Sequence, residues 1–167
     1  MTGPPIRTDI VDVYVFRRPA TGRTAGMQLL QLHRTAKVAL PNTWQPIMGH
    51  MHDGETAART ALRELHEETG YSPATGLLGF WQLERVNTYF LHSHESIIMS
   101  PCFAAEVGDR EPALNVEHDA FRWVRHDHVD RHFLWPGQRL AIGDVLRDIL
   151  DPTSPAEPLL RLDPATV

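Results

Sequence analysis

The chain has 167 residues, of which 42% are hydrophobic and 22% charged, and its formal net charge is −5. This length and composition suit one domain with a sizeable core, and the negative charge argues against a nucleic-acid-binding protein, which needs a basic patch. The single cysteine, Cys102, excludes a disulfide framework and fits a reducing compartment. The N-terminus lacks a signal-like apolar segment, and no run reaches the roughly 18 apolar residues of a membrane span. We therefore expect a cytoplasmic protein without membrane contact.

The N-terminal part of the chain alternates strand and loop signals. After a lead-in, residues 10–16 place Val11, Val13 and Val15 on one face and predict a strand. Residues 17–26 are rich in Gly and Thr and predict a hairpin loop, which leads to a second strand at residues 27–33. A loop then precedes a short predicted strand at residues 44–48.

Residues 49–71, GHMHDGETAARTALRELHEETGY, predict a loop, a helix and a stop. Asp53-Gly54 is a turn dipeptide, the helix begins near Thr56, and Gly70 stands where a left-handed residue ends a helix. At about 100° per residue, one stripe of this helix is expected to face the core. The stripe comprises Ala58, Ala61, Leu62, Leu65 and Thr69.

Three carboxylates share another face of this predicted helix. Glu64, Glu67 and Glu68 follow helical spacing, and Glu55 precedes the helix. Like charges at this spacing destabilise a helix by about 0.2–0.5 kcal/mol per pair, so the cluster is either a solvated acidic face or a site neutralised by a cation. Arg63 compensates one carboxylate, whereas a divalent cation compensates all of them. Hard oxygen ligands favour Mg²⁺ or Mn²⁺ over zinc.

The rest of the chain predicts three strands and a final helix. The strands are expected at residues 77–87, 95–107 and 119–124. Trp135-Pro136-Gly137 opens the helix, with proline at its first position. The expected apolar face of this helix comprises Leu140, Ile142, Val145, Leu146, Ile149 and Leu150.

Asp151-Pro152 ends the last helix and begins a C-terminal tail. Residues 151–167 hold four prolines and few apolar anchors, so we expect an extended arm or a partly disordered tail. The core is expected over about residues 9–150, within a single domain over residues 1–167. The order of strands, helix, strands and helix suits an α/β/α sandwich with a mixed sheet.

The stretch from Gly49 to Tyr71 also carries a specific motif. Five residues separate Gly49 from Glu55, and seven separate Glu55 from Arg63-Glu64-Leu65, which Glu67-Glu68 and Gly70-Tyr71 follow. This spacing matches the Nudix box, GX5EX7REUXEEXGU, at every fixed position, and Tyr71 fills the last aliphatic site. The chain therefore resembles the Nudix hydrolases. The resemblance implies an α/β (α+β) fold, the Nudix-type α/β/α sandwich with a mixed β-sheet, and hydrolysis of acid anhydrides in phosphorus-containing substrates.

The resemblance implies roles for the residues of the box. Mg²⁺ is the implied cofactor, with Mn²⁺ as the alternative. The implied metal site comprises Gly49, Glu55, Glu64, Glu67 and Glu68. The Gly49 backbone lets substrate and metal approach closely, and Arg63 orients a glutamate through a charge-assisted hydrogen bond. One of Glu67, Glu68 and Glu117 deprotonates the attacking water.

Residues 117–123 fit the pattern EHxxFxW. Beside the box, this segment resembles two Nudix branches: the dihydroneopterin triphosphate and dATP pyrophosphatases, and the animal-type diadenosine tetraphosphate hydrolases. In such enzymes the glutamate near this place reaches the metal cluster, which implies a catalytic Glu117. The alternative is an exposed glutamate at a strand edge. Residues 133–139 resemble the start of the last helix in the first branch, so the resemblance to that branch is the closer one.

Five side chains are candidate substrate contacts. Trp44 either stacks on a base or pterin or packs in the core at a strand start. His50 lies in the catalytic loop, and Arg34 is a candidate phosphate contact, together with Lys37 and Arg85. The HxH pairs of the chain lack a third Cys or His ligand at a suitable distance, so surface histidines are favoured over a zinc site.

These features predict a Mg²⁺-dependent pyrophosphohydrolase that cleaves a nucleoside triphosphate-type substrate, of the dATP or dihydroneopterin triphosphate kind, to a monophosphate and pyrophosphate. A diadenosine polyphosphate hydrolase is one alternative, and a non-catalytic nucleotide-binding regulator on a Nudix scaffold is another. The expected partner is a small-molecule nucleotide or pterin triphosphate, without nucleic acid or membrane. The expected state is a monomer or a homodimer.

Overall fold

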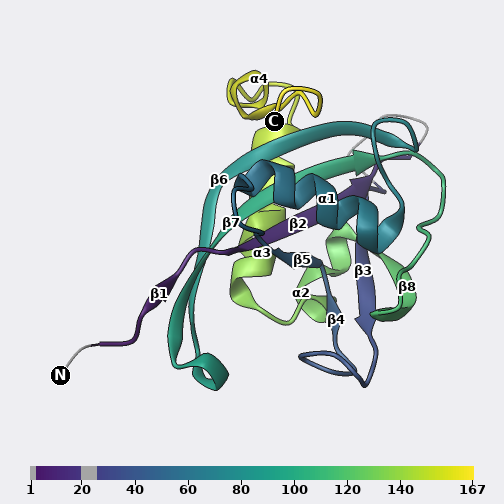
Figure 1. The fold of residues 1–167 in the computed structure, drawn as a ribbon. Helices are drawn as coiled ribbons and strands as arrows, with labels where there is room; N and C mark the ends of the chain where they lie inside the picture. The colour runs from purple at the N-terminus through teal and green to yellow at the C-terminus, as the bar shows by residue number, and fades with distance from the viewer. Residues whose placement is uncertain (1–2, 20–25) are drawn as a thin grey trace.

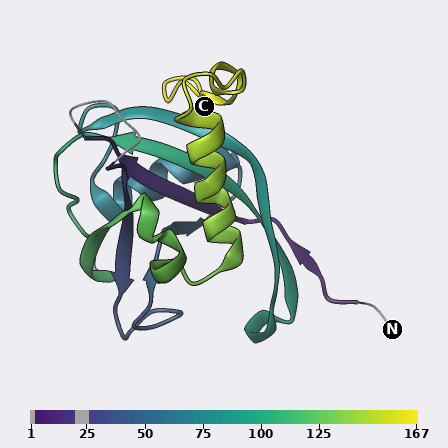
Figure 2. The same ribbon diagram turned by 180° about the vertical axis from the view of Figure 1, so that it is seen from behind.

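The computed structural model describes residues 3–19 and 26–167, and a mixed β-sheet forms its centre (Figure 1). Within these ranges the sheet has eight strands. They are β1 (Ile6–Arg7), β2 (Ile10–Arg17), β3 (Gln28–Arg34), β4 (Trp44–Gln45), β5 (Ile47–His50), β6 (Leu77–Leu91), β7 (Ser96–Val107) and β8 (His118–Arg125). Helix α1 (Ala57–Thr69) lies on one face of the sheet and α3 (Pro136–Asp144) on the other, as the view from behind shows (Figure 2). The predicted α/β/α sandwich with a mixed sheet is confirmed.

Strand β7 makes the sheet mixed. It runs parallel to β1 and β2 and antiparallel to β6. Strand β2 also pairs antiparallel with β3 and β5, and β8 pairs antiparallel with β3. The β3–β8 register places Arg34 opposite His118. The predicted hairpin loop at residues 17–26 lies largely outside the described residues, while the flanking strands pair at Phe16–Leu29 as a hairpin requires.

Alternation along β2 builds both layers of the core. Val11, Val13 and Val15 belong to the cluster that contains Leu65 of α1. The even-numbered Tyr14 and Phe16 belong to the cluster that contains Ala141 and Ile142 of α3. Successive strand residues point to opposite faces, so a central strand covered by a helix on each side is apolar on both.

The predicted strand at residues 44–48 is two strands, because Pro46 has no N–H to continue a ladder. The two residues of β4 pair with β3, whereas β5 pairs with β2. The change of partner carries Gly49 into the centre of the sheet, opposite Val11.

Shorter helical segments connect the outer elements. They are η1 (His92–His94), η2 (His126–His128), α2 (Val129–His132), the π-helix η3 (Val145–Ile149) and α4 (Glu157–Leu160). The last predicted helix is thus α3 continued by η3. Leu140, expected on its apolar face, is 56% exposed. This expectation was wrong because Leu140 lies roughly 140–160° around the helix from the buried Ile142 and Val145. None of the described helices combines the length and apolar character needed to cross a membrane.

The expectation of an extended or disordered tail is wrong. The tail folds back beside β6, with α4 at the end of the molecule where the C-terminus lies (Figure 1). Trp81 Nε1 donates a hydrogen bond to Glu157 (2.9 Å), and the Leu162 N–H donates to the Phe80 carbonyl (2.8 Å). An edge strand exposes unpaired backbone groups, and the tail satisfies some of them.

A buried carboxylate on the α3 side of the sheet makes stability depend on pH. Asp12 is 3% exposed, and its Oδ2 accepts a hydrogen bond from the Asn87 amide (2.7 Å). Burial raises the pKa of Asp12 from 3.8 to about 6, so the fold favours the neutral acid. The stability gained from this preference is fully present below the unfolded-state pKa and is lost as the pH rises through about 6.

We therefore expect Asp12→Asn to raise the free energy of unfolding above wild type by about 3 kcal/mol at neutral and higher pH. The difference should fade toward about pH 4, where wild-type Asp12 is itself neutral. Urea unfolding across this pH range measures the difference in the free energy of unfolding. Asp109→Asn is the matched control, because it changes an exposed aspartate. A difference that stays constant across the range would contradict this account of Asp12.

Candidate active site

Caps at both ends fix α1 beside β5. The Thr56 side chain accepts a hydrogen bond from the Arg59 N–H (3.3 Å), and Gly70 ends the helix at a φ of 72°. The predicted start and stop of the helix are confirmed. Of the predicted core-facing stripe, Ala58 and Leu62 are partly buried. Its fully buried members are Ala61, Leu65 and Thr69.

The three carboxylates of α1 differ in burial although they share one side of the helix. The Glu67 side chain is 51% exposed, the Glu64 side chain is 14% exposed, and Glu68 is buried. Glu68 faces β8, where its Oε2 lies 3.8 Å from His118 Nε2. The alternative of a solvated acidic face is therefore wrong for Glu68.

Gly49 of β5 lies directly against Glu64. A Cβ added at Gly49 would stand 2.0 Å from Glu64 Cγ and 2.1 Å from Glu64 Cδ, closer than real Cβ contacts allow. The absence of a side chain at this position therefore makes room for Glu64. The predicted close approach of substrate and metal to the Gly49 backbone stays a prediction.

Arg63 ties the carboxylates together. Its Nε and Nη2 donate to Glu55 (2.8 and 3.0 Å), and its Nη1 donates to Glu64 (2.8 Å) and Glu67 (3.1 Å). Nη2 also donates to the His50 carbonyl (2.8 Å), which links β5 to α1. Hydrogen bonding from Arg63 is the largest cause that lowers the pKa of Glu55 to about 2. One guanidinium thus orders carboxylates from the loop and from two turns of the helix.

The pKa of Glu68 shifts in the opposite direction to that of Glu55. Burial, followed by repulsion from Glu64, raises its pKa to about 9. Its Oε2 is buried and has no hydrogen-bond partner among the described residues. A buried carboxylate of this kind remains neutral unless a positive charge comes close to it.

The start of β8 brings three more groups to this place. Arg34 Nη2 lies 3.5 Å from Glu117 Oε2, and the charges of Glu117 and Arg34 both act on Glu68. His118 is buried beside them, and burial lowers its pKa to about 4. Sequence reasoning missed His118 as a site residue. The available signal was its place directly after Glu117 in the EHxxFxW segment.

The predicted substrate contacts are less closely grouped. Trp44 is half-buried, and the Arg122 guanidinium covers its ring at 4.2 Å from the centroid. His50 is exposed at the end of β5, and Lys37 is exposed in the loop after β3. Arg85 pairs with Asp144 of α3 on the opposite side of the sheet from α1. The structure therefore removes Arg85 from the candidate site.

The donor set suits a hard divalent cation in its chemistry. It consists of carboxylate oxygens, one of which, Glu68 Oε2, is buried and unpartnered within the described residues. In residues 3–19 and 26–167, no three Asp, Glu, His or Cys side chains already stand as ligands around one point. Arg63 engages Glu55, Glu64 and Glu67 in this structure. A cation at this place competes with Arg63 for these carboxylates.

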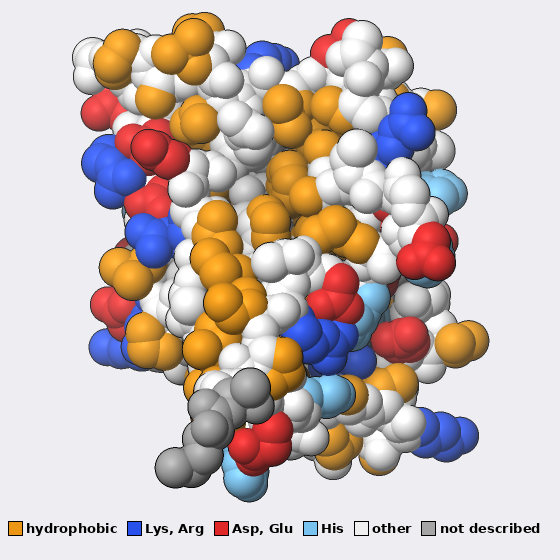
Figure 3. Space-filling model, turned by 60° about the vertical axis from the view of Figure 1, so that its left-hand side comes forward, with side chains coloured by type: hydrophobic (Ala, Val, Ile, Leu, Met, Phe, Trp, Pro, Cys, Tyr) orange, Lys and Arg blue, Asp and Glu red, His pale blue; other side chains and the backbone are white. Residues whose placement is uncertain are grey.

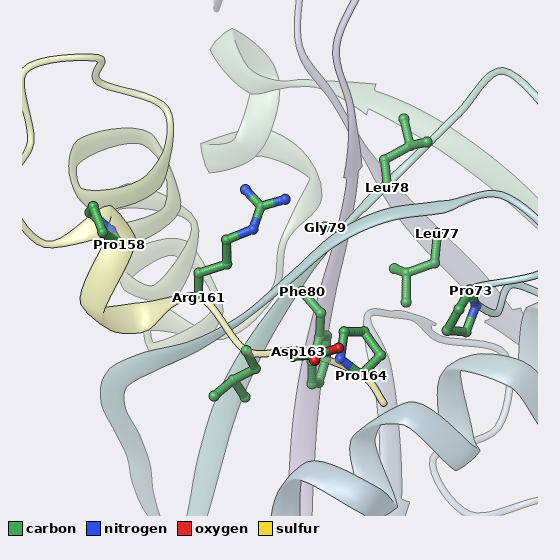
Figure 4. Close-up of a pocket in the computed structure, with 10 residues that line it drawn as sticks. Pro73, Leu77, Leu78, Gly79, Phe80, Pro158, Arg161, Asp163 and Pro164 are labelled. Carbon is green, nitrogen blue, oxygen red and sulfur yellow. The ribbon is translucent and has the colours of Figure 1, made fainter. Parts of the chain in front are cut away.

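Two hollows on the surface lie beside the C-terminal tail, away from the carboxylates. One has a volume of about 490 Å³ and lies between β6, with Leu77 and Phe80, and the tail, with Arg161 and Pro164 (Figure 4). The other has a volume of about 620 Å³ and also borders Arg161. Neither lining includes a predicted site residue.

Charged side chains of both signs are mixed on one face of the molecule. On the face seen in Figure 3, Lys and Arg side chains are interspersed with Asp and Glu, and a band of hydrophobic side chains runs between them.

Sequence comparisons relate the chain to known proteins. A NUDIX domain family model matches residues 8–144. The asymmetrical bis(5'-nucleosyl)-tetraphosphatase of Rattus norvegicus is 33% identical over 86 residues, which are 52% of this chain and 58% of that protein. The enzyme of the same name from Mus musculus is 38% identical over 85 residues, which are 48% of this chain and 54% of that protein. The chain thus spans little more than half the length of these curated relatives.

Solved structures share the fold. The E. coli dihydroneopterin triphosphate pyrophosphohydrolase has a TM-score of 0.65 at 21% identity, with 84% of this chain and 93% of that chain covered. A binary complex of the C. elegans Ap4A hydrolase has a TM-score of 0.66 at 17% identity, with 84% and 96% covered. The family model spans most of the chain and includes the complete motif from Gly49 to Tyr71. The chain therefore belongs to the Nudix family.

Proposed function

We propose that this Nudix protein is a Mg²⁺-dependent pyrophosphohydrolase. Its substrate is a triphosphate of the dATP or dihydroneopterin triphosphate kind, and its products are a monophosphate and pyrophosphate. The observation that carries the proposal is the gathering of Glu55, Glu64 and Glu67 around Arg63, beside the buried and unpartnered Glu68. Nudix hydrolases generally use divalent metals. Of these, Mg²⁺ matches an all-carboxylate donor set, and Mn²⁺ is expected to substitute for it.

The carboxylates of α1 have the central role in this proposal. Glu64, Glu67 and Glu68 hold the cation, and Glu55 assists them from the loop. When bound, Mg²⁺ neutralises charge on the phosphate oxygens and promotes ionisation of water. Arg63 keeps the carboxylates oriented, through the hydrogen bonds that it donates to Glu55, Glu64 and Glu67.

The residues of β3, β4 and β5 contact the substrate in this proposal. Arg34, beside Glu117, binds a phosphate, and the exposed side chain of His50 assists. Trp44 stands opposite His33 at the edge of the sheet, and the proposed stacking on the base or pterin uses the ring face that Arg122 does not cover. One of Glu67, Glu68 and Glu117 takes the proton of the attacking water.

A diadenosine polyphosphate hydrolase is the second candidate. Its support is the likeness in sequence to the two mammalian tetraphosphatases. A non-catalytic nucleotide-binding regulator is less well supported, because every glutamate of the box is present.

A panel of dATP, dihydroneopterin triphosphate, diadenosine tetraphosphate and ADP-ribose, incubated with Mg²⁺, tests these candidates. We expect turnover of one of the two triphosphates, complete loss in excess EDTA and recovery when Mg²⁺ is restored. Ion-exchange chromatography distinguishes release of pyrophosphate from asymmetric cleavage of the dinucleotide. Full turnover in EDTA contradicts the metal assignment, and binding without turnover for every compound favours the regulator.

A further inference from the structure

An arginine lies on one face of the Trp44 ring. The Arg122 guanidinium of β8 is 4.2 Å from the ring centroid, a geometry in which the positive charge is attracted to the aromatic face. Burial lowers the pKa of Arg122 below its usual value, and no carboxylate among the described residues offsets that shift. The contact between Arg122 and Trp44 is therefore not a by-product of an ion pair.

Gln31, a buried residue of β3, fixes the direction of the Arg122 guanidinium. Gln31 Oε1 accepts hydrogen bonds from Arg122 Nε (2.9 Å) and Nη2 (2.7 Å), and Gln31 Nε2 donates to the His132 carbonyl (3.2 Å). A guanidinium can only donate and a carbonyl oxygen can only accept, so the two partners assign both ends of the Gln31 amide. Contacts that run from α2 through Gln31 to Arg122 therefore hold the guanidinium in one orientation.

The pairing of three strands brings Arg122 and Trp44 together. Strand β3 pairs with β8 and with β4, so that Gln31 stands opposite Arg122 and His33 stands opposite Trp44. Gln31 and His33 are two residues apart and share one face of β3, and Arg122 and Trp44 meet over this face from the two sides. The His33 ring lies 4.9 Å from the indole and is tilted by 51° to it, so it touches the indole without lying flat on the ring.

We propose that Arg122 is a positioning residue: held by Gln31, it supports one face of the Trp44 ring and keeps the opposite face presented to the heterocycle of the substrate. This role rests on the proposed function, in which Trp44 stacks on the base or pterin. Arg122 itself does not contact the substrate and acts on binding through Trp44. Stacking uses the face of a ring and not a particular hydrogen-bonding edge, so this device selects triphosphates that carry a flat heterocycle without selecting one base.

The test compares a compound that has a heterocycle with a phosphate chain that has none. KM and kcat are measured on the compound of the panel that wild type turns over, and the inhibition constant is measured for inorganic tripolyphosphate as a competitive inhibitor. We expect Arg122→Met to raise KM by about 3–30-fold, as for loss of a cation–π contact, with little change in kcat or in the inhibition constant. Arg125→Met, which changes an exposed arginine of the same strand, should change none of the three. An unchanged KM in Arg122→Met, or an equal change in the inhibition constant, overturns the proposal.

Combining Arg122→Met with a change at Trp44 shows whether Arg122 acts through the ring. Trp44→Leu alone removes the stack and should raise KM by about 5–150-fold, the range for loss of one base–aromatic contact. In Trp44→Leu protein, adding Arg122→Met should raise KM no further, because the ring that Arg122 supports is absent. A wild-type KM in Trp44→Leu, or the same effect of Arg122→Met with and without Trp44, contradicts the proposal.

Variants of Gln31 cover the case in which Arg122→Met fails to fold. Gln31→Glu keeps an acceptor for both donors of Arg122, whereas Gln31→Met removes it. We expect Gln31→Met to raise KM and Gln31→Glu to stay close to wild type, both measured on protein whose folding is checked by thermal denaturation. Equal KM values in these two variants count against the positioning role.

The proposed function and the positioning role fail in different ways. If wild type turns over no compound of the panel, the proposed function fails and the positioning role fails with it. If wild type turns over a compound and Arg122→Met has the same KM for it, only the positioning role is contradicted.

Discussion

Glu68→Gln is expected to lower kcat by roughly 10²–10⁴-fold, the range for loss of a general base, and by a comparable amount if Glu68 is instead a metal ligand. The substitution keeps the size of the side chain and replaces an acid whose charged form burial disfavours with a permanently neutral amide. The variant should therefore fold, and without divalent cation its melting temperature should equal or exceed that of wild type. Steady-state kinetics on the substrate found in the panel and thermal denaturation measure the two effects.

The cation provides a further measurement for the same variant. Mg²⁺ should raise the melting temperature of wild type, because it binds only the folded state, and should raise that of Glu68→Gln much less. Glu84→Gln is the matched control, since Glu84 is exposed on β6, outside the candidate site. Near-normal turnover of Glu68→Gln would show that Glu68 is neither a ligand nor the base.

Gly49→Ala is the second change with a large expected effect. The new Cβ would stand 2.0 Å from Glu64 Cγ, so the Glu64 side chain must leave its place and its hydrogen bond to Arg63 (2.8 Å). Displacing a group at a reactive centre by about 1 Å can cost on the order of 10²-fold in rate, and overpacking costs about 1–3 kcal/mol of stability. We expect Gly49→Ala to lower kcat and the free energy of unfolding by these amounts. Steady-state kinetics and urea unfolding measure the two losses.

A double variant tests whether the clash with Glu64 causes the effects of Gly49→Ala. In Glu64→Ala protein the clash is absent, so adding Gly49→Ala should cost little further stability. Gly143→Ala is the matched control, because a Cβ there meets nothing within 4 Å. In that helix, alanine should stabilise by up to about 1 kcal/mol and leave kcat unchanged. A stability loss from Gly49→Ala that persists in Glu64→Ala protein would assign the role of Gly49 to the backbone instead.

Local signals in the sequence were sufficient to predict the helix that carries the motif. Its start at Thr56 and its end at Gly70 depend on caps, which involve only neighbouring residues. The alternation of Val11, Val13 and Val15 correctly placed one face of β2 in the core. The family was also readable from the sequence, because the spacing of the box is contained within one loop and one helix.

Signals that depend on distant packing misled the prediction in two places. The tail was expected to be extended or partly disordered, but the unpaired edge of β6 gives it hydrogen-bond partners. Arg85 was a candidate phosphate contact, but its strand directs it to Asp144 on the other face of the sheet. Both outcomes depend on which element lies opposite, which no local pattern records. The error at Leu140 was a local one, because the helical period already places Leu140 away from the buried Ile142 and Val145.

The sequence by itself therefore determined the residue types of the candidate site: four glutamates and one arginine at fixed spacings, on a helix whose ends are set by its own caps and in the loop before it. Only the tertiary structure decided their environments. Glu67 and Glu68 are adjacent in sequence, yet the Glu67 side chain is exposed, whereas Glu68 is buried against His118 of β8. The same packing brings His118 to Glu68 and gives that carboxyl its raised pKa, since burial and neighbouring charge are properties of the assembled fold.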